Sequence, residues 1–549
     1  MRDDAIPVRF DGEALTARRG ETLLAALTAA GVVALRRTAG GEPRGAWCGM
    51  GACQECVVRL GDGRVERACM VKVDRPVDAF TITDPLPLGE GAAAHPPRRG
   101  ADLPLVAPDL LVIGAGPAGL AAAVEARAAG LDVLLVDERA APGGQYFKPL
   151  TVAARPGPDA QHRAGTALVA EARARGVVFA PETLVWGAFP GPVFAATGPA
   201  GAMRIAPRAA ILGTGAVERA WHVPGWTLPG VMTTGAAQTL WRSARRVPRG
   251  RILIAGNGPL NLQLAAELLG AGAEVVGLAE AAAAPRLRDW RAVMAMAAAA
   301  PALVVQGARY RQRLVGAGVP MRHATVVSRV EAGPDGLVVS LAGGEPGDVT
   351  VDTLCLGYGL DPANELARAL GCTFVADAES GRLVPERDAD GGASVAGIYL
   401  VGDGVRLGGA HVAMAEGRLA GTSAAAWLGR PVDPLVRQHA RDTLRRHRRF
   451  QRALWQLYAP AMPLVPATTP ETLLCRCERV TAAAVDAAIA AGHGSAGSVK
   501  QATRLGMGRC QGRYCTAALT ERLGRSGDPM GGFAPRAPVR PIAIGDLAR

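Results

Sequence analysis

The sequence has no long uninterrupted apolar run, so it predicts no membrane-spanning segment. The best candidate, residues 292–305, is shorter than the roughly 20 residues that a spanning helix needs, and Pro301 interrupts it. The amino-terminal residues MRDDAIPVRF contain no apolar signal core, so we expect a cytoplasmic protein. A reducing compartment disfavours disulfides as the purpose of the ten cysteines.

The sequence also lacks the residue constellations of common hydrolytic and acid–base catalysts. Its eight histidines are scattered, and neither a Ser–His–Asp arrangement nor a pair of carboxylates stands out. His411, beside the segment VGDG, is the one histidine that we regard as a site candidate, although a packing role is the simpler interpretation. The sequence therefore names no catalytic residue.

Positive charge is in excess, and the net charge is +12. A basic protein can bind nucleic acid, but arginine is spread along this chain and only residues 437–452 are densely basic. Within them an arginine recurs every four residues, which puts these side chains on one helical face: Arg437, Arg441, Arg445 and Arg449. We interpret this face as solvated, with an acidic partner protein as the alternative, and expect no nucleic-acid partner.

Eight of the cysteines form two groups of four, one near each end of the chain. The first group, Cys48, Cys53, Cys56 and Cys69, has the spacing C-x4-C-x2-C-x12-C and opens as a plant-type ferredoxin does. Small residues in WCGMGACQEC let a loop wrap closely, so that backbone N–H groups can point at sulfide. We predict a [2Fe-2S] cluster, with zinc as the alternative.

The second group, Cys475, Cys477, Cys510 and Cys515, has the spacing C-x-C-x32-C-x4-C. C-x-C is a poor disulfide geometry, and four thiols favour a bound metal. We predict a second [2Fe-2S] cluster, with zinc or a redox disulfide as alternatives. We expect nearby basic side chains to offset the negative charge of this cluster: Lys500, Arg504 and Arg509.

Residues 109–138 predict a strand, a glycine-rich turn, a helix and a second strand, the fingerprint of a dinucleotide-binding fold. Gly114, Gly116 and Gly119 allow the tight turn and bring the helix N-terminus against a pyrophosphate, whose negative charge the helix dipole favours. Asp137, at the end of the second strand, is placed to bind adenosine ribose hydroxyls, with Glu138 as the alternative.

Residues 251–280 form a second, degraded fingerprint. It keeps Gly256 and Gly258, but Asn261 stands where the third glycine should be. Because that glycine allows close helix–strand packing, we expect looser packing with the fold retained. Glu280, if it faces a nucleotide, favours a free 2′-hydroxyl. A functional NAD(H) site and a structural relic both remain open.

The pattern divides the chain into successive units. Strand and helix alternate from residue 108 to about 430, as in doubly wound α/β folds. We expect the proline- and glycine-rich tail to be poorly ordered. The units are a ferredoxin-like domain (1–84), a linker (85–107), an FAD-binding domain (108–250 and 351–430), an NAD-binding-like domain (251–350), a basic helix and linker (431–470), a second [2Fe-2S] module (471–525) and a tail (526–549).

Together these motifs resemble those of a known family. In order they are the first cysteine group, GAGPAG, APGGQ, LGTGAVER, PGWTLPGVMTTGAAQ, GNGPLN, LGYGLDPANELARALGC, VGDG and GMGRCQGRYC. This set resembles the α subunits of FAD-dependent amine and amino-acid dehydrogenase complexes, such as hydrogen cyanide synthase, opine oxidase and D-hydroxyproline dehydrogenase, and also sarcosine oxidase α. The first cysteine group is similar to their small ferredoxin subunit, fused here to the α chain, and the second to bacterioferritin-associated ferredoxin.

The resemblance implies an α/β flavoprotein with two dinucleotide-binding domains of the pyridine nucleotide-disulfide oxidoreductase type, an N-terminal β-grasp [2Fe-2S] domain and a C-terminal helical [2Fe-2S] module. Relatives hold FAD, NAD or ATP in the first nucleotide site, and some hold FMN at a subunit interface. The cysteine pair of disulfide reductases is missing near APGGQYFK, and Cys355 and Cys372 are expected core residues. Further cofactor-binding candidates are Gly144, Gln145, Gly215, Gly402 and Asp403.

The resemblance also implies a division of labour. A separate β subunit, a flavoprotein of the amino-acid oxidase type, would oxidise a CH–NH or CH–NH2 donor. This chain would pass the electrons through flavin and clusters to a quinone or another electron carrier. One alternative is an NADH-dependent reductase that feeds a ferredoxin-type acceptor. Another is a non-catalytic redox scaffold.

Overall fold

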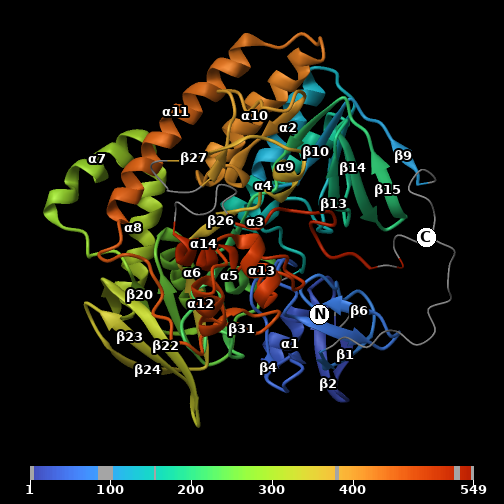
Figure 1. Ribbon diagram of the computed structural model, residues 1–549. Coiled ribbons are helices and arrows are strands. Elements are labelled where there is room, and N and C mark those ends of the chain that lie inside the picture. The colour runs from blue at the N-terminus through green and yellow to red at the C-terminus, as the bar shows by residue number, and fades with distance from the viewer. Residues whose placement is uncertain are drawn as a thin grey trace.

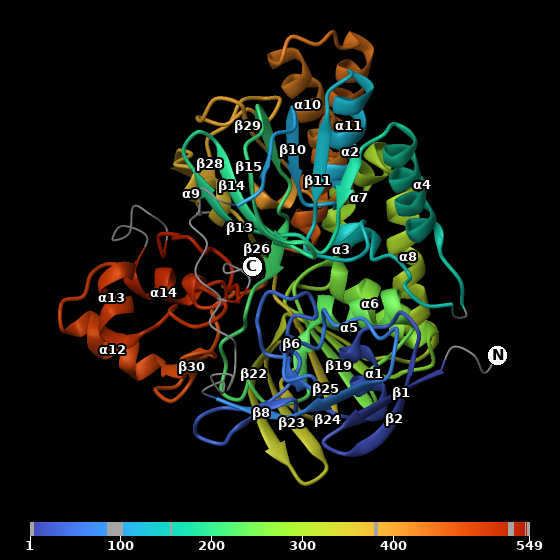
Figure 2. The same cartoon turned by 90° about the vertical axis from the view of Figure 1, so that its right-hand side faces the viewer.

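The computed structural model describes residues 5–84, 103–153, 156–377, 383–524, 532–543 and 545. Figure 1 shows the first dinucleotide-binding domain at the top, the second at the lower left and the N-terminal domain at the lower right. The C-terminal module lies between them at the front, and a turned view shows it projecting beside the N-terminal domain (Figure 2). The N-terminal domain and the C-terminal module therefore lie side by side.

The N-terminal domain is a five-stranded sheet with one helix packed on it. Its elements are β1 (Ala5–Phe10), β2 (Glu13–Arg18), α1 (Leu23–Ala30), β5 (Val57–Leu60), β6 (Val65–Arg67) and β7 (Val77–Phe80), with sheet order β2-β1-β7-β5-β6. Apolar side chains alternate along β1, so that Ile6, Val8 and Phe10 face the core. Thr22 caps α1 by accepting a hydrogen bond from the Ala25 amide. The predicted ferredoxin-like domain is confirmed.

The first dinucleotide-binding domain is built on a parallel sheet of order β12-β11-β10-β16-β29. Its strands are β10 (Leu110–Ile113), β11 (Val133–Val136), β12 (Val178–Ala180), β16 (Ala209–Leu212) and β29 (Ile398–Leu400), and its main helices are α2 (Pro117–Ala128), α4 (Ala160–Ala174) and α10 (Gly409–Trp427). Every residue of β10 is buried, because helices or a second sheet cover both faces. That second sheet is antiparallel for three strands, β13 (Leu184–Phe189), β14 (Val193–Gly198) and β15 (Gly201–Ile205), and ends with β9 (Leu105–Val106).

The second dinucleotide-binding domain repeats this plan with sheet order β18-β25-β19-β20-β21. Its elements are β18 (Val231–Thr233), α5 (Thr234–Ala244), β19 (Arg251–Gly256), α6 (Pro259–Gly270), β20 (Glu274–Glu280), α7 (Trp290–Ala299), α8 (Pro301–Gly316), β21 (Met321–His323), β25 (Thr353–Gly357) and the hairpin sheet β22 (Thr325–Gly333), β23 (Gly336–Gly343) and β24 (Gly347–Val351). Leu27 of α1 and Leu240 of α5 share one hydrophobic core, and a buried Glu21 pairs with Arg246 at 2.8 Å. The N-terminal domain is therefore packed firmly on this second domain.

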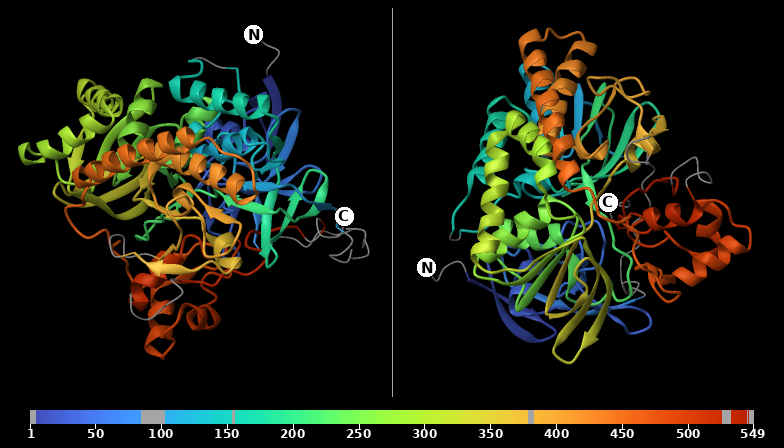
Figure 3. Two further views of the ribbon diagram at one scale, coloured as in Figure 1. Left: turned by 90° about the horizontal axis from the view of Figure 1, so that it is seen from above. Right: turned by 90° about the vertical axis from the view of Figure 1, so that its left-hand side faces the viewer.

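The long helix α11 (Pro434–Leu457) lies along α10 and reaches α7, as the views from above and from the side show (Figure 3). Our interpretation of its arginine face as solvated is wrong in part. Arg437 and Arg441 both pair with Asp390, and Arg448 pairs with the buried Glu416 at 2.9 Å. The carboxylates that these arginines meet come from the same chain.

The C-terminal module contains β30 (Leu473–Cys475), β31 (Val480–Thr481), α12 (Ala482–Ala490), α13 (Ala496–Thr503) and α14 (Thr516–Leu523). The expectation of a poorly ordered tail is wrong for residues 532–543. Phe533 and Val539 are buried, and the Val539 amide donates to the Trp186 carbonyl at 2.7 Å. A segment that forms no helix or strand can still be fixed by its apolar side chains and by hydrogen bonds to neighbouring backbone. Among the described residues, no helix is long and apolar enough to span a membrane.

Helices α2 and α10 pack closely through glycines on α10. A Cβ atom added at Gly421 would press into the carbonyl of Ala122, whereas one added at Gly307 in α8 would meet nothing within 4 Å. We therefore expect Gly421→Ala to destabilise the protein by about 1–3 kcal/mol through overpacking. Gly307→Ala should stabilise it by about 1 kcal/mol through helix propensity. Thermal unfolding of both variants checks this, and equal effects would contradict the packing argument.

Candidate cluster sites and nucleotide cavity

Three cysteines of the first group lie in a tight, buried loop that precedes β5, and the fourth, Cys69, follows β6. Cys48, Cys53, Cys56 and Cys69 are all 5% exposed or less. The amides of Met50 and Cys53 point at the Cys48 sulfur, at 3.5 and 3.4 Å, and the Glu55 amide points at the Cys53 sulfur at 3.4 Å. Burial raises the pKa of the Cys48 thiol, but its hydrogen bonds outweigh burial and lower that pKa to about 6. The thiolate form is thus favoured at Cys48, whereas burial raises the pKa of Cys53 and a hydrogen bond with Cys56 raises that of Cys69.

Two glycines make this loop possible. Gly49 and Gly51 adopt φ of 59° and 80°, a region that favours glycine. A Cβ at Gly51 would also lie 2.9 Å from the Met70 sulfur. Four buried thiols with inward amides fit an anionic [2Fe-2S] cluster. In the part of the chain that is described, no three His, Cys, Asp or Glu side chains converge as they would around a single metal ion.

The second group is assembled from β30 and the loop that precedes α14. A Cβ at Gly508 would collide with Cys477, so the loop approaches that cysteine as closely as its glycine allows. The charge partners that we expected are placed elsewhere. Arg504 pairs with Glu478 at 2.8 Å, Arg509 pairs with Asp84, and Lys500 lies over the ring of Phe533. The two arginines therefore have carboxylate partners, and the lysine has an aromatic one.

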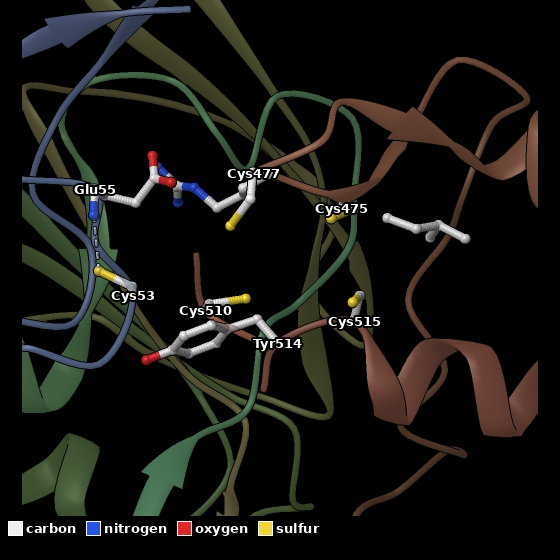
Figure 4. Close-up of a pocket in the computed structure, with 9 residues that line it drawn as sticks. Cys53, Glu55, Cys475, Cys477, Cys510, Tyr514 and Cys515 are labelled. Carbon is white, nitrogen blue, oxygen red and sulfur yellow. Dashed lines mark hydrogen bonds and ion pairs between the residues drawn. The ribbon is translucent and has the colours of Figure 1, made fainter. Parts of the chain in front are cut away.

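The two cysteine groups lie against each other. Cys53 and Glu55 from the first loop line the same small cavity, of about 10 Å³, as the second group and Tyr514 (Figure 4). Arg476, between Cys475 and Cys477, reaches across this boundary and pairs with Glu55 at 3.3 Å. Sequence reasoning missed both Arg476 and Glu55, because only the tertiary structure brings them together.

A cavity of about 530 Å³ opens above the carboxyl ends of β10 and β11. Gly116 is the N-cap of α2 and has no side-chain cap, so the first amides of the helix are available to a phosphate. Gly119 lies outside the cavity, and its missing side chain lets α2 pack on the Gly114 carbonyl. The predicted residues that line the cavity are Gly114, Gly116, Asp137, Glu138, Gly144, Gln145, Gly215, Gly402 and Asp403.

Asp137 and Glu138 have different roles in this cavity. The two Asp137 carboxylate oxygens accept from the amides of Ala115 at 2.6 Å and Arg139 at 2.8 Å, so this side chain fixes the glycine turn. One Glu138 oxygen lies 3.8 Å from Arg540, and the other is buried without a hydrogen-bond partner. The geometry therefore favours Glu138, our alternative, as the acceptor for ribose hydroxyls.

The far end of the cavity holds titratable groups that sequence reasoning missed. Lys148 donates to the Gly235 carbonyl at 2.9 Å and to Thr239 at 2.8 Å, while Glu218 accepts from the Gly235 amide at 2.8 Å. Burial lowers the pKa of Lys148 to about 7 and raises that of Glu218 to about 7. Both lie in segments that the sequence analysis quotes, APGGQYFK and LGTGAVER, but only their contacts with α5 single them out.

Two further candidates also belong to the cavity wall. Asp403 accepts from the amides of Gly408 and Gly409 at the start of α10, at 2.9 and 3.2 Å. His411 lines the cavity and stacks on His447, with 4.5 Å between ring centroids, and burial lowers the pKa of His411. Its imidazole is thus held neutral beside the cavity.

The second fingerprint is occupied by the chain itself. The Gly258 amide donates to the buried Glu280 carboxylate at 3.2 Å, and the ring of Trp455 lies over Gly258. Gly256 and Gly258 do not line the large cavity. The expectation of looser packing at Asn261 is wrong, because its amide donates to the Gly357 carbonyl at 3.0 Å and its oxygen accepts from Thr234 at 2.8 Å. The asparagine ties α6 to the sheet by hydrogen bonds.

Residues 108–417 match the family described as pyridine nucleotide-disulphide oxidoreductase. The chain belongs to this family. Residues 3–83 match a 2Fe-2S iron-sulfur cluster binding domain, and residues 473–525 match a BFD-like [2Fe-2S] binding domain. An oxidoreductase of this family is a flavoprotein, so the matches imply FAD together with iron–sulfur clusters.

Relatives with established names extend this assignment. One subunit of the opine oxidase of Rhizobium meliloti is 36% identical over 80% of this chain and 98% of its own length. Hydrogen cyanide synthase subunit HcnB of Pseudomonas aeruginosa is 30% identical, with 79% and 96% covered. The solved structure of L-proline dehydrogenase from P. horikoshii has the same fold, with a TM-score of 0.71 at 21% identity over 100% of this chain and 98% of that chain. The resemblance inferred from the motifs is confirmed.

Because Glu138 has an unpartnered buried oxygen, we expect Glu138→Gln to weaken FAD binding. A hydrogen bond to a charged group contributes roughly 1.5–3 kcal/mol, so the dissociation constant should rise roughly 10- to 100-fold. Flavin fluorescence during dissociation measures this. Glu171→Gln, in an exposed pair with Arg175, is the matched control. Unchanged affinity in the Glu138 variant would refute the assignment.

Because Glu280 and Trp455 occupy the second fingerprint, we expect no saturable binding of NADH there. Steady-state NADH oxidation by the purified chain should be negligible, while dithionite should still reduce its redox centres. Fast, saturable NADH oxidation would contradict this and would favour the NADH-dependent reductase.

Proposed function

We propose that this chain is the electron-transferring subunit of an amine or amino-acid dehydrogenase or oxidase complex that acts on CH–NH or CH–NH2 donors. The observation that supports this best is that one cavity reaches the loops that bear both cysteine groups. Met50 from the first cysteine loop and Arg513 from the second both line the nucleotide cavity. A flavin in that cavity would have an electron exit through either loop.

The residues present fit FAD. The α2 N-terminus and Gly114 would hold the pyrophosphate, and Glu138 would hold the adenosine ribose. Asp403, in the turn that precedes α10, would face the ribityl chain. When bound, FAD supplies a centre that accepts two electrons together and releases them singly, as one-electron clusters require. The four cysteines of each group would hold one [2Fe-2S] cluster.

Lys148 and Glu218 are placed to handle protons at the far end of the cavity. Electron transfer to a cluster carries no proton, so the protons released when a reduced flavin is reoxidised would need acceptors in the protein. With pKa values of about 7, each group can give or take a proton near neutral pH. In this scheme Lys148 Nζ and the Glu218 carboxylate would take up and release protons at the cavity wall.

Substrate oxidation belongs to a partner in this proposal. The relatives named above are subunits, which implies assembly with other chains. We assign the substrate site to a flavoprotein of the amino-acid oxidase type, and the electrons leave to a quinone or another carrier in the cytoplasm. An opine is the substrate class that the name of the first relative suggests.

Co-expression with a candidate flavoprotein partner of the amino-acid oxidase type tests this function. The complex should reduce a dye when given the amine or amino acid, whereas the single chain should not. Cys53→Ser and Cys510→Ser should each remove half of the iron, leave FAD bound and lower dye reduction, because each disrupts one cluster. Rapid oxidation of an amino acid by the chain alone would overturn the proposal.

A further inference from the structure

Arg476 occupies a buried position between the two cysteine groups. Its side chain is 3% exposed, and its guanidinium lies 4.9 Å from the ring centre of Trp47 and 5.0 Å from that of Trp226. Trp47 precedes Cys48 in the chain, and Arg476 stands between Cys475 and Cys477. A cation from the C-terminal module is thus inserted among aromatic rings beside the first cysteine loop.

This cation belongs to a buried network with excess positive charge. Glu55, between Cys53 and Cys56, is 1% exposed and accepts from Arg36 at 3.0 Å. Arg44 also lies close enough to lower the pKa of Glu55, although burial opposes this. Three buried arginines therefore surround one buried carboxylate. Asp84 pairs with Arg36 and Arg509 at the edge of the network, which leaves the buried excess in place.

Arg476 is paired with Glu55 by charge and Glu42 acts on Arg44, but these carboxylates do not balance the three buried arginines. The Nε, Nη1 and Nη2 atoms of Arg476 are buried and make no hydrogen bond, and the same holds for the Nε atoms of Arg36 and Arg44. A buried charge without hydrogen-bond partners is costly. Thiolate-bound clusters are anionic, so a cluster on each side of the network would supply the missing negative charge.

The space between the two groups is very small. Cys53 and Glu55 line the same cavity of about 10 Å³ as Cys477 and Cys510, which is room for about one water molecule. Trp47 also contacts Tyr514, the neighbour of Cys515, with 6.4 Å between ring centroids. The two cluster sites are therefore separated by a thin, well-packed layer.

We infer that the two cluster sites act as one coupled pair, in which Arg476, paired with Glu55, is a positioning residue that sets the potentials of both. This rests on the proposed assignment of a cluster to each cysteine group. One electron moves from the reduced site to the oxidised site, and no bond or proton is exchanged. Reduction adds negative charge beside Arg476 from either side, so its cation stabilises both reduced states.

Electron paramagnetic resonance of the full-length chain tests the pairing. Cys53→Ser and Cys510→Ser give the spectrum of each cluster alone. The fully reduced wild-type chain should then show extra splitting or broadening from the interaction of two neighbouring spins. Two intact clusters, verified by iron and sulfide content, whose spectrum is the plain sum of the single ones would overturn this inference. Missing iron would instead overturn the proposed function.

A redox titration followed by the same spectra tests Arg476. Arg476→Gln should lower the midpoint potentials of both clusters, and Arg476→Lys, which keeps the charge, should restore them in large part. Arg504→Gln is the matched control, because Arg504 lies in the same module, is 67% exposed and has its own carboxylate partner. If Arg476→Gln loses iron, the inference is tested instead by the midpoint potentials of Arg476→Lys and by the spectrum of the reduced wild-type chain. Potentials that move no more than in the Arg504 control would refute the tuning role.

Discussion

The buried pairing of Arg476 with Glu55 is the interaction on which the rest of the arrangement depends. It joins the last module of the chain to the first, across more than four hundred residues of sequence. Removing one partner of a buried ion pair commonly costs about 3–5 kcal/mol, because the other charge is left uncompensated. The pair therefore fixes the second cysteine group against the first. It also places the loop that bears Arg513 at the wall of the nucleotide cavity.

Other contacts between distant segments also bring residues to the nucleotide cavity. Glu21 and the shared core of α1 and α5 hold the N-terminal domain on the second dinucleotide-binding domain, so that Met50 reaches the cavity from one side. The tail returns through Val539 and brings Arg540 beside Glu138. The second dinucleotide-binding domain contributes packing surfaces and cavity wall, while residues near the end of α11 cover its own fingerprint. In this account it is a support rather than a second nucleotide site.

The sequence was sufficient for features that depend on local spacing. The cysteine groups, the glycine turn at Gly114 and the strand–helix alternation are set by residues close in the chain, and the domain matches confirm the fold that they predict. The sequence was insufficient where contacts between distant segments determine the role of a residue. Asp137 and Glu138 are adjacent, and only the positions of the Ala115 amide and Arg540 distinguish their roles. Arg476 and Lys148 could not be singled out among so many basic residues until their burial was known.

The central claim is that one chain holds a flavin and two clusters in electronic contact. An anaerobic titration with dithionite, followed by absorbance and electron paramagnetic resonance, tests it most directly. The account predicts that each chain takes up two electrons for the flavin and one for each cluster, with all three centres reduced in the same protein. Uptake of two electrons alone, with flavin bleaching and no cluster signal, would contradict it.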